Sequence, residues 1–115
     1  MSKCKDNPRK PKRQNKVLTV ARVDAIPEGR SATVQLNDGS EIALFKAQGK
    51  FYAIENFCPH KGVPLADSRL YGSIVECDWH GWQFDLRSGK CLTKPKCSIE
   101  TYEVRIEDGW IKIVV

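Results

Sequence analysis

The chain has 115 residues, the length of one small domain, and leaves no room for a second folded unit. Hydrophobic residues make up 41% of it and charged residues 29%, which excludes a fibrous or wholly disordered protein. Because no apolar run reaches the ~18 residues of a membrane helix, and the basic start lacks the apolar stretch of a secretory signal, we expect a soluble, cytoplasmic protein.

The first 16 residues carry the excess of positive charge. Residues 1–16 hold seven Lys or Arg against the single acid Asp6, a net charge of +6, whereas residues 17–115 hold 12 basic and 13 acidic side chains, a net −1. The first segment also lacks apolar periodicity. We therefore predict a flexible basic tail at 1–16, with Cys4 as an incidental free thiol, followed by one domain at 17–115.

Short segments rich in β-branched and aromatic residues follow the tail, at 17–23, 33–36, 41–46, 51–55, 74–77, 101–106 and 110–114. Asn, Asp and Gly, which tolerate the positive φ of tight turns, lie between several of them, at 37–39, 48–49, 88–89 and 108–109. No segment has helical periodicity over three turns. The pattern predicts an all-β fold, a small antiparallel sandwich or barrel.

Two stretches, 57–70 and 78–95, interrupt the strand pattern and are dense in Gly, Pro, Trp, Cys and His. Long irregular loops in a compact domain are usually functional. We expect both stretches to lie at one end of the sheet and to carry the site there.

Both histidines of the chain lie beside cysteines in these stretches. Cys58-Pro59-His60 opens the first, and Cys77-Asp78-Trp79-His80 opens the second. Two thiolates and two imidazoles suit either a tetrahedral zinc ion or a cluster with one Cys-ligated and one His-ligated iron. Zinc sites generally place about two to four residues between paired ligands, and the first pair here has a single intervening residue.

At these positions the chain resembles the Rieske family, whose motif is Cys-x-His followed at a distance by Cys-x-x-His. All four positions match, with sixteen residues between His60 and Cys77, and the following residues 61–62 and 81–85 are also similar. The resemblance runs from residue 17 to the C-terminus. It implies a Rieske fold with a two-loop tip and one [2Fe-2S] cluster, in which Cys58 and Cys77 bind the inner iron and His60 and His80 the outer iron.

The resemblance is closest to the low-potential members of the family. High-potential members carry an additional cysteine in each loop and hydroxyl groups near the cluster, whereas this chain has no such cysteines and has Trp82 and Phe84 at the hydroxyl positions. It therefore implies a potential toward the low end of the Rieske range, roughly −150 mV. Cys91 and Cys97 flank a loop that the family places over the cluster. We expect both thiols to be unbridged, and the alternative is a labile disulfide between them.

The resemblance implies an electron-transfer protein rather than an enzyme. It would accept one electron from a flavin-dependent reductase and deliver it to a terminal oxygenase or nitrite reductase, whose ferredoxin component or small subunit the chain is similar to. Two histidines do not provide the separate mononuclear iron site of an oxygenase. We expect no membrane or nucleic-acid partner. The alternative from another class is a zinc-binding interaction module whose basic tail binds nucleic acid.

Overall fold

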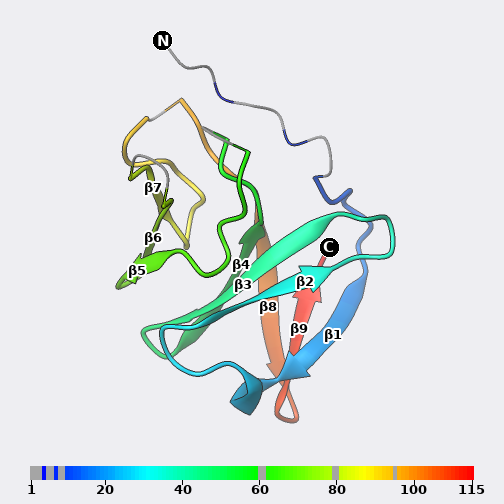
Figure 1. Cartoon of the computed structure of the whole chain (residues 1–115). Coiled ribbons are helices and arrows are strands. Elements are labelled where there is room, and N and C mark those ends of the chain that lie inside the picture. Colours follow the sequence, from blue (N-terminus) through cyan, green and yellow to red (C-terminus); the bar gives the residue numbers. More distant parts are fainter. Residues whose placement is uncertain (1–3, 5–6, 8–9, 60–61, 79–80, 95) are drawn as a thin grey trace.

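The computed structural model describes residues 4, 7, 10–59, 62–78, 81–94 and 96–115. Their regular structure consists of strands and one short 3-10 helix, η1 (Val23–Ala25), as Figure 1 shows. The strands are β1 (Val17–Arg22), β2 (Ser31–Gln35), β3 (Glu41–Ala47), β4 (Lys50–Glu55), β5 (Arg69–Tyr71), β6 (Ile74–Glu76), β7 (Gln83–Asp85), β8 (Thr101–Glu107) and β9 (Trp110–Val114). The all-β prediction is confirmed.

The strands form two antiparallel sheets. The larger sheet has the order β1-β9-β8-β4-β3-β2 and curls into a nearly closed barrel whose edges are β1 and β2. The smaller sheet has the order β5-β6-β7. In the described part of the chain, no helix is of a length and hydropathy that could cross a bilayer.

Every predicted strand is present, but two further strands lie within the stretches expected to be irregular. β5 and β7 are only three residues long and are extended because each pairs with β6. The prediction of irregular structure over 57–70 and 78–95 is therefore wrong for these segments. A signal for β7 exists in the sequence, because the apolar residues Trp82, Phe84 and Leu86 alternate with polar ones, and the structure buries all three.

The hairpin of β3 and β4 separates two hydrophobic cores. Ile42 and Leu44 face the core inside the larger sheet, and the alternate residues Ala43 and Phe45 face the other way, toward the smaller sheet. The base core consists of Ile26, Ile42, Leu44, Ala53, Tyr102, Ile111, Ile113 and Val115. The tip core consists of Ala43, Phe45, Ala47, Ile54, Cys58, Leu65, Val75, Cys77, Trp82, Phe84, Leu86, Cys91, Cys97 and Ile99.

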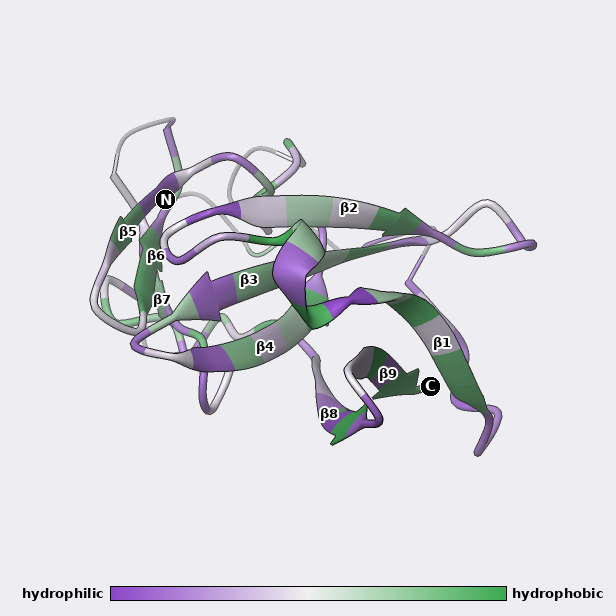
Figure 2. Cartoon of the chain, turned by 90° about the horizontal axis from the view of Figure 1, so that it is seen from below, coloured by the Kyte–Doolittle hydropathy of each residue, from purple (hydrophilic) through white to green (hydrophobic). Residues whose placement is uncertain are grey.

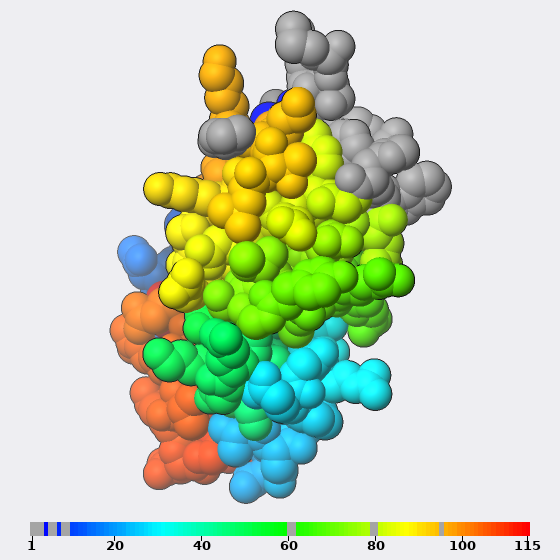
Figure 3. Space-filling view, turned by 90° about the vertical axis from the view of Figure 1, so that its left-hand side faces the viewer, coloured from blue at the N-terminus to red at the C-terminus, as the bar shows by residue number. Residues whose placement is uncertain are grey.

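Two further views show how hydropathy and the loop segments are distributed over the molecule. In Figure 2 hydrophobic residues are concentrated on the strands, and most connecting turns are hydrophilic. In Figure 3 the segments 62–78 and 81–94 gather at one end of the molecule, beyond the green and cyan residues of the larger sheet. We call this end the tip. The expectation that the irregular stretches share one end of the fold is confirmed.

The N-terminal segment contacts both parts of the molecule. Lys16 pairs through its backbone with Val115, with N to O distances of 3.2 and 2.8 Å. Farther along, the Arg13 guanidinium donates to Glu100 and to the Thr101 carbonyl oxygen, both at 2.8 Å, and Lys10 donates to Glu100 at 2.8 Å. These two donors lower the pKa of the Glu100 carboxyl below its ordinary value. The predicted flexibility of residues 1–16 stays a prediction.

Two cysteine predictions are wrong. Cys4 is not a free thiol, because it forms a disulfide with Cys97, with the two Cα atoms 5.7 Å apart. Cys97 is therefore bridged, and its partner is not Cys91, which is a buried free thiol. The sequence could not reveal this pair, because its members are 93 residues apart and the segment that carries Cys4 has no strand pattern.

The turn at 88–89 contains a close backbone approach. Gly89 has φ of +79°, and a Cβ atom there would lie 2.1 Å from the carbonyl oxygen of Ile99. The same contact includes a hydrogen bond from the Ile99 N–H to the Gly89 carbonyl oxygen at 2.9 Å. Glycine is required here by both conformation and space.

The first loop at the tip is held by one polar side chain. Asn56 follows β4, and its Oδ1 accepts hydrogen bonds from the backbone N–H groups of Leu65 at 2.8 Å and Ala66 at 2.9 Å. Its Nδ2 donates to Glu41 at 3.0 Å. Asn56 therefore clamps the two ends of the segment that contains Cys58.

We predict that Gly89→Ala destabilises the chain much more than Gly29→Ala. Both glycines have φ of +79°, but a Cβ at Gly29 would meet nothing within 4 Å. Gly29→Ala should lower the free energy of unfolding by roughly 1–2 kcal/mol through backbone strain alone. Gly89→Ala should lower it by more than ~3 kcal/mol because the backbone at Ile99 must move. Denaturant unfolding measures both, and equal losses would contradict the close approach.

We predict that Asn56→Ala lowers the free energy of unfolding by about 1–3 kcal/mol, because it leaves the buried Leu65 N–H without its acceptor. Asn37→Ala is the matched control, since Asn37 is exposed in the turn between β2 and β3 and its loss should change stability by no more than ~0.5 kcal/mol. Thermal and denaturant unfolding report the difference. Equal stability of the two variants would show that Asn56 does not hold the loop.

Candidate metal centre

The two candidate thiol ligands lie in the same core. Cys58 follows β4 and is 0% exposed, and Cys77 follows β6 and is 1% exposed. Both belong to the tip core, so the fold brings together the two cysteines that the motif singles out. The candidate imidazole ligands His60 and His80 lie outside the described residues. The described residues alone do not group three or more side chains of metal-binding type.

The two loops close in the same way. In the first, the N–H of Cys58 donates to the carbonyl oxygen of Val63 at 2.8 Å, and in the second the N–H of Cys77 donates to the carbonyl oxygen of Trp82 at 2.7 Å. Each closing residue is preceded by a glycine of positive φ, Gly62 at 72° or Gly81 at 71°. Each candidate cysteine therefore begins a hairpin of equal length, and a left-handed glycine turns the chain back.

The surroundings of the two cysteines are apolar. Leu65, Trp82 and Phe84 pack in the same core, and Phe84 is completely buried. On the other face of the smaller sheet, Gln83 donates to Glu76 at 3.0 Å and joins β6 to β7 at the partly exposed surface. Cysteine thiolates are the ligands that soft metals and iron–sulfur clusters prefer, and an apolar shell shields such a cluster from water, so this setting fits an iron–sulfur cluster.

A third segment, 91–97, completes the tip. The Leu92 N–H donates to the carbonyl oxygen of Gln83 at 2.8 Å, and the Gln83 N–H donates to Thr93 Oγ1 at 3.1 Å. The segment is thus attached to β7, and it leaves the Leu92 side chain 50% exposed. Single exposed apolar side chains of this kind are ordinary on protein surfaces.

Two residues that hold the segments around the candidate centre in place were not singled out by the sequence analysis. Asn56 clamps the first loop, and the buried carboxylate of Glu55 accepts a hydrogen bond from the Glu100 N–H at 2.8 Å. Neither residue carries a motif of its own. The signal in the sequence is their position, two and three residues before Cys58 and at the end of an apolar segment.

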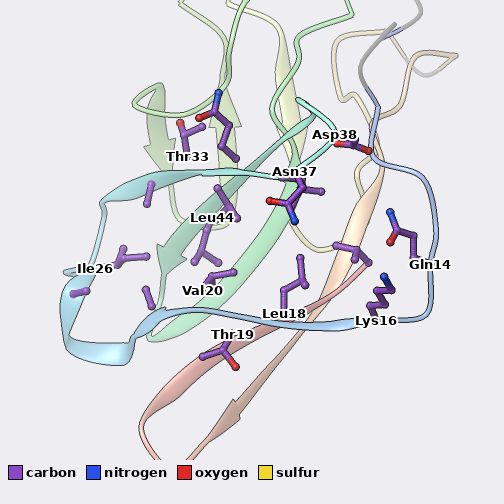
Figure 4. A pocket seen from close by; sticks show the side chains of 17 residues that line it. Gln14, Lys16, Leu18, Thr19, Val20, Ile26, Thr33, Asn37, Asp38 and Leu44 are labelled. Atoms are coloured by element: carbon purple, nitrogen blue, oxygen red, sulfur yellow. The ribbon is translucent and has the colours of Figure 1, made fainter.

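A groove of about 720 Å³ lies away from this centre, between the sheet edges β1 and β2. Leu18, Val20 and Leu44 point into it, as Figure 4 shows, and Lys16 and Asp38 lie at one end. Neither candidate cysteine lines it. Because its floor belongs to the base core, the groove is the gap between the two sheet edges and not a part of the candidate centre.

Comparisons with known proteins agree with this geometry. The chain is 40% identical over 92 residues to the ferredoxin component of the naphthalene 1,2-dioxygenase/salicylate 5-hydroxylase systems of a Ralstonia species, covering 79% of this chain and 88% of that relative. Its structure is similar to the ferredoxin of Sphingomonas yanoikuyae B1, with a TM-score of 0.79 and 31% identity over 87% of this chain and 99% of that one.

A second structural neighbour represents another type of system. It is a Mycobacterium tuberculosis protein described as the small subunit of an NADH-dependent nitrite reductase, with a TM-score of 0.78 and 28% identity over 84% of this chain and 92% of that one. The family model described as the Rieske [2Fe-2S] domain matches residues 16–103, most of the chain. With the two buried cysteines on matched hairpins of an all-β fold, the chain belongs to the Rieske [2Fe-2S] domain family.

Proposed function

We propose that this protein is a soluble, cytoplasmic Rieske ferredoxin, a one-electron carrier that binds one [2Fe-2S] cluster through Cys58, His60, Cys77 and His80. The observation that carries the proposal is the meeting of two buried cysteines in one apolar core, each at the start of a hairpin of the same length. The chain then divides into a basic segment, 1–16, and the Rieske domain, 17–115.

Each residue has a defined part in this proposal. Cys58 and Cys77 would hold the inner iron, and His60 and His80 the outer iron. The cluster, when bound, supplies reversible one-electron chemistry. The tip core keeps water away from the two sulfur ligands, and the Asn56 clamp holds the first loop in place. An electron carrier needs no substrate pocket, which agrees with the position of the groove at the base.

The potential of this carrier should lie at the low end of the Rieske range. Donors to the ligand sulfurs stabilise the more negative, reduced state and raise the potential. Trp82 and Phe84 bring no hydroxyl group to the tip core, and Phe84 is fully buried there. We therefore infer that this centre has fewer such donors than the high-potential members of the family.

The partners follow from the relatives. The Ralstonia relative is named as the ferredoxin component of a dioxygenase system, which supports a terminal oxygenase as electron acceptor and a flavin-dependent reductase as donor. The similarity to a nitrite reductase small subunit makes a nitrite reductase the second candidate acceptor. The comparisons give no support to the alternative of a zinc-binding module that uses nucleic acid as its partner.

The proposal predicts a coloured protein with about two irons and two acid-labile sulfides per chain when it is purified without oxygen. Dithionite should bleach it and produce a paramagnetic signal in the EPR spectrum. Cys58→Ser should lose most of the iron, whereas Cys91→Ser, which changes another buried cysteine of the tip core, should keep it. A colourless protein with one bound zinc would contradict the proposal.

Replacing Phe84 with Tyr should raise the reduction potential by tens of millivolts. The substitution adds a single hydroxyl group inside the core that holds both cysteines, and a donor there favours the reduced cluster. Phe45→Tyr adds the same hydroxyl group to this core on strand β3 and is the matched control; it should leave the potential nearly unchanged, because Phe84, and not Phe45, stands at a position where the family resemblance implies a hydroxyl. Protein-film voltammetry measures both potentials, and an unchanged or lowered potential in Phe84→Tyr would show that this position does not face the cluster ligands.

A further inference from the structure

The disulfide between Cys4 and Cys97 joins the N-terminal segment to the tip. Cys97 is a member of the tip core and is 5% exposed, whereas Cys4 is exposed. The Cα separation of 5.7 Å is ordinary for a disulfide. One end of the bond is therefore fixed in a packed core, and the other end can be reached by a reductant.

The remaining contacts of this segment lie where tip and base meet, at Glu55 and Glu100, a place we call the seam. We use the name strap for its described residues 4, 7 and 10–16. The Asn7 side chain donates to the buried Glu55 carboxylate at 3.1 Å, Lys10 and Arg13 bind Glu100, and the strap reaches the base at Val115. The strap thus spans from the last residue of the chain to the segment that ends at Cys97.

These polar contacts are weak individually. The side chains of the Lys10 and Arg13 ion pairs are 46% and 53% exposed, and exposed pairs contribute little to stability in water. Among the described residues of the strap, Pro11 is the buried one, and residues 12–16 are exposed. A covalent bond that closes a loop of this length restricts the open states far more strongly. Attachment of the strap therefore depends chiefly on the disulfide.

The strap also covers Tyr102, whose buried hydroxyl lacks a hydrogen-bond partner among the described residues. Arg13 lies over the ring of Tyr102, 4.4 Å from its centroid. The Tyr102 hydroxyl is buried and, among the described residues, has no hydrogen-bond partner. A buried hydroxyl without a hydrogen-bond partner destabilises the closed state, and contact with water would remove this penalty. This favours opening of the strap once the covalent bond is removed.

We propose that the Cys4–Cys97 disulfide is a redox-responsive latch, which holds the strap across the seam when oxidised and releases it when reduced. The reductant is a protein or small-molecule dithiol. Its two thiols supply two electrons and two protons, the bond between the two sulfurs breaks, Cys4 and Cys97 become thiols, and the dithiol becomes a disulfide. Disulfides inside cells are usually redox-sensing rather than structural, which agrees with this assignment.

The latch would change the electrostatic character of the molecule. Residues 1–16 carry a net charge of +6, while the rest of the chain carries −1. The described residues of the strap include Lys10, Lys12, Arg13 and Lys16 and no acidic residue, so release would turn a fixed positive strap into a mobile one. None of the four proposed cluster ligands takes part, so the inference does not depend on the proposed electron-carrier function.

Limited trypsin digestion of the full-length, cluster-containing protein tests the latch. Cleavage after Lys12 and Arg13, followed by mass spectrometry, should be at least about tenfold faster after incubation with a thioredoxin-class dithiol, because cleavage follows the population of the open strap. The intact mass after alkylation without reduction should show that Cys4 and Cys97 are not alkylated in the oxidised sample, because the disulfide protects both sulfurs. The absorption spectrum, recorded throughout, shows whether the cluster is unchanged.

Two variants make the test decisive. Cys4→Ser should be cleaved at the fast rate under both conditions, and Cys91→Ala should keep the redox dependence of the parent protein. Slow cleavage of Cys4→Ser would overturn the inference, because the strap would then be held without the disulfide. It would equally be overturned by alkylation of Cys4 and Cys97 in the oxidised sample, or by equal cleavage rates of the parent protein in both redox states.

Discussion

Burial of one hairpin on both faces is the constraint on which the rest of the structure depends. β3 and β4 are the common wall of two cores, so both faces of each strand must be apolar, and β3 is accordingly a nearly continuous run of buried residues. A shift of one residue in the register of either strand would exchange the residues that face the two cores. The wall therefore fixes the position of the tip relative to the base.

The candidate centre follows directly from this wall. β4 ends at Glu55, Asn56 clamps the next segment, and Cys58 enters the tip core immediately afterwards. The smaller sheet brings Cys77 to the same core from the other side. The two sheets thus hold both thiol groups in one buried core.

The sequence was sufficient where a periodic or local signal exists. Segments rich in β-branched and aromatic residues predicted the strands of the larger sheet, and the turn residues predicted the hairpins. The motif around Cys58 and Cys77 predicted two residues that the fold places in one core. The sequence was insufficient where a contact between distant residues determines the conformation or the partner of a residue. β5 is extended because β6 pairs with it, Asn56 is a clamp because Leu65 returns to it, and Cys4 meets Cys97 only in the folded chain.

The shared wall also has a consequence for how the protein loses its structure. If the tip detached, Ala43, Phe45 and Ile54 would be exposed to water on strands whose opposite side still lines the base. Separate unfolding of the tip would therefore cost the free energy of exposing these apolar residues. The two halves should unfold as one cooperative unit despite their separate cores. A protein built in this way keeps the core around Cys58 and Cys77 packed for as long as its barrel stays folded.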